Sequence, residues 1–145
     1  MNWNEAEYDA LIERLQTNYP GMFDRPYGGV STGPGWWPIV ESLCSNIESH
    51  QTWNNQMAAR YPAEYTAFKP VQVAQIKEKF GGLRFYYDGG DAQIRGMVQM
   101  AEAWAENTCE ECGKPGKRRS GGWIRTLCDE HEDERQRKMN EQRHS

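Results

Sequence analysis

The chain has 145 residues, which is the size of one domain or of one domain with a small appendage. Its formal net charge of −4 argues against polyanion binding by the chain as a whole, although the charge is uneven. Residues 1–70 carry −4, residues 71–107 carry −1 and residues 108–145 carry +1. We find no apolar run of about 18 residues and no basic-then-apolar start. We therefore expect no membrane span and no signal peptide. The use of three of the four cysteines as thiolates, argued below, fits a reducing cytosol.

The first half of the chain predicts two amphipathic helices. The first covers residues 4–19 and ends at the Pro-Gly pair that follows. Residues 23–35 are rich in glycine and predict a loop. A second helix is predicted from Pro38 to about Gln51, with Cys44 inside its apolar stripe as a small buried hydrophobe. Residues 54–69 remain open between a short helix and an irregular connection.

Residues 71–88 predict a β-hairpin, because two β-prone runs meet at Gly81-Gly82. This turn would place Lys79 opposite Arg84 and Lys77 opposite Tyr86. One face of the hairpin would then be apolar, with Phe80 on it, and the other basic. Glu78 would fall on the apolar face, which requires either a buried cation beside it or a different register. The two valines at the start are out of phase with Ile76, so we expect a bulge near Ala74.

A third helix is predicted over residues 91–107, with Asp91 as its N-cap and Trp104 on its apolar stripe. We expect the C-terminal segment to dock on Trp104 and its neighbours. Residues 132–145 are polar on nearly every side, which is typical of a solvated helix or of an arm for a partner.

Four potential metal ligands occur between residues 109 and 131, in the pattern C-x-x-C, 15 residues, C-x-x-H. They are Cys109, Cys112, Cys128 and His131. Pairs with this spacing can share one tetrahedral zinc ion. Because protein side chains would fill all four positions, we expect one structural Zn²⁺ and no open catalytic position. Reduced or disulfide-bonded cysteines would not explain a histidine at ligand spacing.

Turn residues divide the 15-residue spacer into two short runs, which predict a hairpin followed by a helix that begins near Cys128. The turn that carries the first cysteine pair, residues 109–113, is called the knuckle. A knuckle, a hairpin and a helix in this order form a treble-clef or zinc-ribbon type of module. The predicted fold class is therefore α+β, with helices packed on a small antiparallel sheet. We predict two units, an α+β domain at 1–107 and a zinc module with a polar C-terminal helix at 108–145.

Two stretches carry a resemblance to a known group of proteins, Ile76-KEKFGGLRF-Tyr86 and the zinc module with its CEECGKPG and GGWIRTLCDEH segments. Over about residues 36–131 the chain resembles small uncharacterised proteins of tailed phages and prophages. The resemblance implies a bacterial host cell and a phage origin, but no established activity. By analogy, small accessory phage proteins often bind host proteins or sequester nucleotide signals of antiviral defence.

Two candidate binding surfaces follow, on the hairpin and on the zinc module. The first hypothesis is a non-catalytic binding protein, a phage accessory or counter-defence factor whose ligand is a nucleotide-like molecule or a host protein. Its candidate ligand residues are Lys77, Lys79, Arg84, Tyr86, Trp36 and Trp37. The alternative that these cations simply extend into water stays open.

The second hypothesis is a nucleic-acid-binding zinc-finger regulator, which would use basic residues and an aromatic ring of the zinc module. These residues are Lys114, Lys117, Arg118, Arg119, Trp123 and Arg125. The surrounding acidic residues argue against it, and the patch could instead neutralise a three-thiolate site. We find no nucleotide-binding glycine motif, nucleophile elbow or metalloprotease helix, so we expect no enzyme activity. The oligomeric state cannot be predicted from the sequence.

Overall fold

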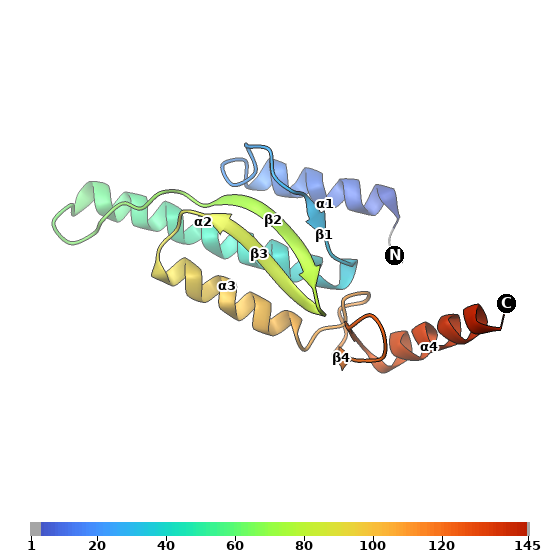
Figure 1. Cartoon of the computed structure of the whole chain (residues 1–145). Helices are drawn as coiled ribbons and strands as arrows, with labels where there is room; N and C mark the ends of the chain where they lie inside the picture. The colour runs from blue at the N-terminus through green and yellow to red at the C-terminus, as the bar shows by residue number, and fades with distance from the viewer. Residues whose placement is uncertain (1–3, 145) are drawn as a thin grey trace.

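The computed structural model describes residues 4–144 and has an α+β architecture, as the sequence predicts. Three helices and a three-stranded sheet form the larger part, and a small two-stranded sheet and a last helix follow (Figure 1). In chain order the elements are α1 (Glu5–Asn18), β1 (Val30–Ser31), the 3-10 turn η1 (Pro34–Trp36), α2 (Trp37–Arg60), β2 (Gln72–Lys79), β3 (Gly82–Asp88), α3 (Ala92–Ala105), β4 (Lys117–Arg119), β5 (Arg125–Leu127) and α4 (Asp129–Arg143).

The predicted helices are confirmed, but α2 is longer than its apolar stripe indicates. It continues to Arg60, so part of the stretch at 54–69 is helical. Its second half is buried through polar side chains, which the apolar pattern does not reveal. The Gln51 Oε1 atom accepts a hydrogen bond from the Val71 amide at 2.6 Å, and the Asn54 amide donates to the Thr66 carbonyl at 3.1 Å. These bonds satisfy buried polar groups and extend the helix past the apolar stripe.

The main sheet has the order β1-β2-β3 and is mixed, not wholly antiparallel. Strands β2 and β3 form the predicted hairpin, whereas β1 pairs in parallel with β2, with Val30 opposite Ile76. This short strand comes from the glycine-rich stretch predicted as a loop, so the prediction of a purely antiparallel sheet is wrong. Two residues are too few to produce a readable period-2 pattern.

The predicted turn of the hairpin is wrong by one residue. Lys79 pairs with Gly82, so the two turn residues are Phe80 and Gly81, with φ angles of +52° and +81°. Two positive φ angles are typical of a type I′ turn, whose twist matches that of the strands. The Glu78 carboxylate accepts a hydrogen bond from the Gly81 amide at 2.7 Å, which stabilises the turn. This accounts for an acidic residue next to the apolar face without a buried cation.

The corrected register redistributes the side chains of the hairpin. Lys77 now lies directly opposite Arg84, and Phe80 is 67% exposed at the turn instead of lying on the apolar face. Leu83 and Phe85 remain buried on the inner face. A register shift between Val73 and Gln75 confirms the bulge predicted near Ala74.

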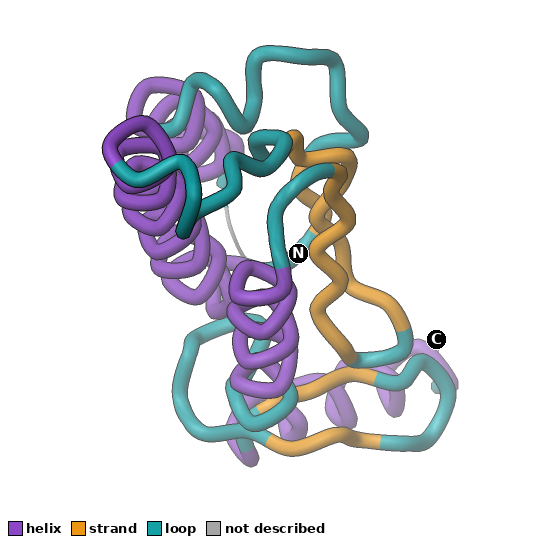
Figure 2. Tube along the Cα trace, turned by 90° about the vertical axis from the view of Figure 1, so that its left-hand side faces the viewer, coloured by secondary structure: helices purple, strands orange, loops and turns teal. Residues whose placement is uncertain are grey.

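Helices α1, α2 and α3 lie on one side of the main sheet and leave its other face without a helix (Figure 2). Helix α3 contacts both β3 and α2, and α1 contacts α2. The core lies between these elements. Its largest fully buried side chains are Trp36, Leu11, Leu15, Met22, Ile39, Ile47, Ile76, Leu83 and Ile94. The predicted N-cap of α3 is also confirmed, since the Asp91 carboxylate accepts a hydrogen bond from the Ile94 amide at 3.0 Å.

The C-terminal segment docks on the loop before α2 and on the tip of the β2–β3 hairpin. The Gly35 amide donates to the Glu110 carbonyl at 2.7 Å, and the Trp36 indole donates to the Thr108 carbonyl at 2.8 Å. At the hairpin, the Thr126 hydroxyl donates to the Gly81 carbonyl at 2.6 Å. Trp104, the predicted docking residue, is instead 51% exposed. These contacts cross the predicted boundary near residue 107.

Substituting Gly35 tests this docking, because a side chain there has no room. A Cβ atom at Gly35 would collide with the Cys109 carbonyl and lie 2.6 Å from the Gly113 amide nitrogen. We expect Gly35→Ala to lower the free energy of unfolding by about 1–3 kcal/mol, as overpacking does. The measurement is urea unfolding followed by circular dichroism.

Gly96→Ala is the matched control, since no atom lies within 4 Å of a Cβ at this position in α3. There alanine should raise stability by up to about 1 kcal/mol through helix propensity. Equal effects of the two substitutions would contradict the tight docking.

Candidate metal centre

The four predicted ligands converge on one point between the end of α3 and the start of α4. Cys109 and Cys112 lie on the turn after α3, Cys128 is the N-cap of α4, and His131 lies in the first turn of that helix. One ligand atom from each side chain lies within 4.8 Å of every other. This group could therefore hold a metal ion and is consistent with a zinc site.

The distances between the ligand atoms test whether a zinc ion fits. Zinc bonds of about 2.3 Å to sulfur and 2.0 Å to nitrogen give tetrahedral edges of about 3.8 Å for S–S and about 3.5 Å for S–N. The sulfurs of Cys112 and Cys128 are 3.8 Å apart. The His131 Nδ1 atom lies 3.6 Å from the Cys109 sulfur and 3.2 Å from the Cys128 sulfur. These three edges fit a tetrahedral Cys₃His site, in which Nδ1 would be the histidine ligand.

The backbone around Cys109 favours a thiolate. Burial by itself raises the pKa of the Cys109 thiol, but hydrogen bonds from the amides of Cys128, Cys112 and Glu111 reverse this, so the pKa lies below its usual value. The turn closes at Gly113, which has a φ angle of +82° and donates its amide to the Cys109 carbonyl at 2.9 Å. Glycine adopts this conformation without Cβ strain.

The crowding of sulfur atoms has the opposite effect on the second cysteine. Burial, followed by the neighbouring sulfurs of Cys109 and Cys128, raises the pKa of Cys112 to about 11. Several thiolates at this separation repel one another, and a bound cation removes the repulsion. Metal binding should therefore release protons and become weaker at low pH.

A carboxylate lies beside the ring nitrogen of His131 that faces away from the cysteines. The His131 Nε2 atom lies 3.5 Å from the Glu111 carboxylate. Glu111 in turn accepts a hydrogen bond from Arg125 at 3.1 Å, and the same guanidinium group lies 3.5 Å from Glu110. A carboxylate behind a histidine ligand fixes the ring orientation and increases its basicity. The sequence spacing gave no indication of this role for Glu111.

The basic residues predicted as a nucleic-acid surface differ in their partners, because some of them bind acidic side chains and others do not. Arg125 is held by the two glutamates of the knuckle, and Arg119 donates to the Leu127 carbonyl and to the Asp129 carboxylate at 2.7 Å. The pKa of Asp129 is lowered by this bond. Lys114 lies 3.9 Å from Glu130. The six residues therefore do not form one patch. Of their five cations, which all lie within the described residues 4–144, Lys117 and Arg118 are exposed and form no ion pair, and Trp123 is exposed beside them in the sequence.

The fourth cysteine is separate from this centre. Cys44 is fully buried in α2 among core residues. Burial, with a smaller contribution from the Glu41 charge, raises the pKa of its thiol to about 12. The thiol is therefore protonated at neutral pH, which confirms the prediction of a small buried hydrophobe.

The outer face of the main sheet carries the other candidate surface. Lys77 and Arg84 are direct cross-strand partners, and Lys79 and Tyr86 alternate with them on the same face. Trp36 and Trp37 do not belong to this surface. They are only 0% and 6% exposed, and their indoles donate to backbone carbonyls in the core. Their inclusion among the ligand residues is corrected, because the Trp-Trp pair starts α2 on the inner side.

A histidine–aspartate pair lies away from both surfaces. The His50 Nε2 atom is 2.8 Å from the Asp91 carboxylate, and this contact joins α2 to the start of α3. The His50 ring also stacks on Phe68, with centroids 5.6 Å apart. Burial opposes ionisation of Asp91, but hydrogen bonds from His50 and the Ile94 amide lower its pKa. We interpret the pair as a structural link between the two helices.

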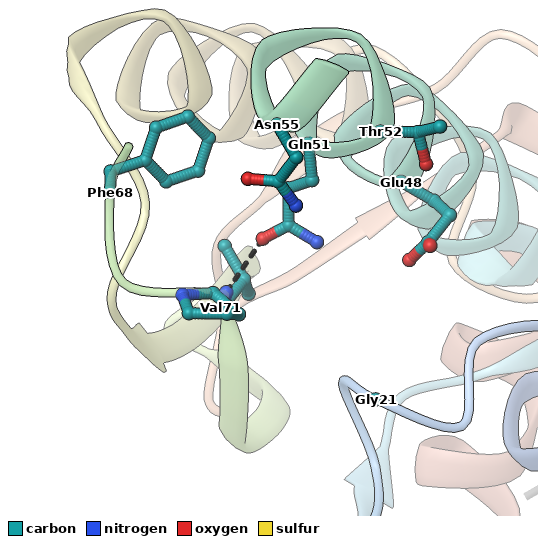
Figure 3. Close-up of a pocket in the computed structure, with 8 residues that line it drawn as sticks. Gly21, Glu48, Gln51, Thr52, Asn55, Phe68 and Val71 are labelled. Atoms are coloured by element: carbon teal, nitrogen blue, oxygen red, sulfur yellow. Dashed lines mark hydrogen bonds between the residues drawn. The ribbon is translucent and has the colours of Figure 1, made fainter. Parts of the chain in front are cut away.

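A small cavity lies nearby, between α2 and the segment that leads into β2 (Figure 3). Figure 3 shows the hydrogen bond from the Val71 amide to Gln51 across its floor, with Glu48 on one side and Phe68 on the other. Its volume of about 190 Å³ is below the range usual for ligand pockets. It contains an acidic residue and no basic residue, so it does not suit an anionic ligand.

Comparison of the chain with protein-family models, with curated proteins and with solved structures found no match. Within residues 4–144, no helix is both long enough and apolar enough to cross a membrane.

Substitution of Glu111 tests its role behind the histidine ligand. We expect Glu111→Gln to weaken metal binding about 10-fold to 100-fold, because the amide cannot stabilise positive charge on the imidazole. The measurement is competition for zinc with a chromophoric chelator. The exposed Glu106 at the end of α3 provides the control, and Glu106→Gln should leave the affinity unchanged. Unchanged affinity in the Glu111 variant would refute the assignment.

Proposed function

We propose that this protein is a non-catalytic binding protein that holds one structural zinc ion and binds a phosphate-bearing, nucleotide-like ligand on the outer face of its main sheet. The observation that supports the proposal most is a group of three cations, Lys77, Lys79 and Arg84, on the open face of the hairpin. Within residues 4–144 none of them forms an ion pair. Tyr86, which is 41% exposed on the same face, supplies a ring for stacking.

Electrostatics favours an anion at this position. Lys77 and Arg84 are direct partners in the ladder, and like charges in this arrangement destabilise a sheet. A bound phosphate would neutralise both. The Nη1 atom of Arg84 donates one hydrogen bond to the Leu83 carbonyl at 3.0 Å. The other N–H groups of the guanidinium remain as donors for a ligand.

The metal would have a structural role in this account. Four protein ligands close a tetrahedral site and leave no position for water or substrate. A site of this kind contributes on the order of 10 kcal/mol of folding free energy. We infer that the metal site, the hairpin β4–β5 and the helix α4 together form a treble-clef or zinc-ribbon-like module.

The biological setting comes from the resemblance to small phage and prophage proteins. It favours an accessory or counter-defence factor in the bacterial cytoplasm that sequesters a nucleotide signal. A host protein is the other candidate partner. The two differ in the chemistry they require, because a nucleotide needs the exposed cations and a protein partner need not use them.

Isothermal titration calorimetry with a panel of mono-, di- and cyclic nucleotides tests the proposed ligand class. We expect Lys79→Glu combined with Arg84→Glu to weaken binding at least about 100-fold, because two charge-assisted hydrogen bonds are lost. Arg95→Glu on α3 reverses an exposed charge outside the sheet and should leave binding unchanged. The nucleotide hypothesis fails if the unaltered protein binds nothing in the panel, or if the double variant binds as tightly.

A further inference from the structure

The basic outer face of the hairpin continues beyond its tip, onto the zinc module. The turn residue Gly81 packs against β4 and the start of β5. A Cβ atom built on it would lie 3.5 Å from the Arg118 Nε atom and 3.2 Å from the Ile124 side chain. The neighbouring Gly82 is covered by Arg84, whose Nη1 atom lies 2.9 Å from a Cβ built there. Two guanidinium groups from distant parts of the sequence therefore flank one turn.

We propose that these residues form a single binding surface for a single-stranded nucleic acid, which we call the strand surface. It consists of Lys77, Lys79, Arg84 and Arg118, with the aromatic rings of Phe80 and Tyr86. This inference rests on the proposed function and extends it, because the same outer face holds the first phosphates. The sequence places Arg118 in a different candidate site, and only the docking of the module brings it to the hairpin.

The dimensions of the surface favour a strand over a mononucleotide. From Tyr86 to Gly82 the strand β3 covers about 14 Å at 3.4 Å per residue, and Arg118 extends the surface past the tip. In a stacked strand there is one phosphate for about every 3.4 Å of rise along the helix axis. The surface can therefore contact roughly four nucleotides, and it offers four cations for them.

The aromatic residues favour unpaired bases. Phe80 is 67% exposed and Tyr86 is 41% exposed. Stacking on such rings tolerates any base but requires that the base is not already stacked in a duplex. The Lys79 ammonium lies 6.0 Å from the centroid of the Phe80 ring, so a phosphate contact and a base contact are available side by side.

Acidic side chains near the surface are engaged by other groups or lie at its end, and Glu102 accepts a hydrogen bond from the Phe85 amide of β3 at 3.1 Å. The Glu78 carboxylate accepts a hydrogen bond from the Gly81 amide, and the knuckle residues Glu110 and Glu111 form ion pairs with Arg125. Asp88 is at the far end of β3, opposite Gln72. Most of the net negative charge belongs to residues 1–70 and should limit unspecific binding of polyanions elsewhere.

Fluorescence anisotropy with a labelled oligothymidylate of about 12 nucleotides tests the strand surface over a series of salt concentrations. Four phosphate contacts predict a slope of about −2.8 for log K against log salt on a single strand. Arg118→Gln should reduce the slope by about 0.7, whereas Arg95→Gln should not change it. Phe80→Ala should weaken the complex about 5-fold to 150-fold without an effect on the slope.

Competition experiments separate this inference from the proposed function. We expect a thymidine mononucleotide to bind more weakly than the oligonucleotide and to be unaffected by Arg118→Gln. The inference is overturned if the oligonucleotide binds no tighter than the mononucleotide, or if duplex DNA of equal length competes equally well. In both cases the proposed nucleotide site stands. If neither ligand binds, the inference and the proposed nucleotide site both fail.

Discussion

The convergence of four candidate metal ligands on one point is the constraint on which the C-terminal quarter of the structure depends. The segment from residue 108 to the start of α4 has almost no hydrophobic core. Its buried apolar cluster consists only of Cys109, Leu127 and Cys128, and two of these are ligands. So small a cluster cannot compensate for the conformational entropy lost on folding. A metal ion at this site would supply the missing free energy, and the distances between ligand atoms are consistent with a zinc site.

Glu110 connects the metal centre to the main body through two hydrogen bonds. This residue is 6% exposed, its carbonyl accepts the Gly35 amide, and its carboxylate accepts the Gly33 amide at 2.9 Å. Burial raises the pKa of Glu110, although the Gly33 amide and Arg125 oppose this. A buried carboxylate of this kind costs free energy, and its hydrogen bonds specify one docking position for the knuckle. The same docking brings Arg118 to the tip of the hairpin, so the composition of the exposed surface depends on the metal centre.

The sequence predicts the metal centre well because ligand spacing is a local property. Two C-x-x-C/H pairs require no knowledge of the fold, and all four side chains converge as expected. The sequence also predicts helix α1, the N-cap Asp91 and the bulge near Ala74, since each depends on neighbours along the chain. The sequence does not predict the turn of the hairpin correctly. Whether Phe80-Gly81 or Gly81-Gly82 forms the turn depends on the Glu78 carboxylate and on the contact with Thr126.

Long-range contacts explain the remaining differences. An adjacent pair of tryptophans is compatible with a surface or a core position. In the fold Trp36 is buried, and its indole donates to the carbonyl of Thr108, which is 72 residues away in the sequence. Arg119 and Arg125 look like solvent-exposed cations in the sequence, but each is held by acidic residues that the fold brings near. Glu111 becomes a partner of His131 only once the knuckle and α4 meet.

Native mass spectrometry of the protein purified from a bacterial lysate tests the central claim most directly, because it measures the bound metal on the intact chain. We predict one zinc ion per chain, lost in Cys109→Ser and retained in Cys44→Ala. A co-purified nucleotide or oligonucleotide would appear as added mass in the same spectrum. A chain without metal, or one lighter by the two hydrogens of a disulfide bond, would contradict the account.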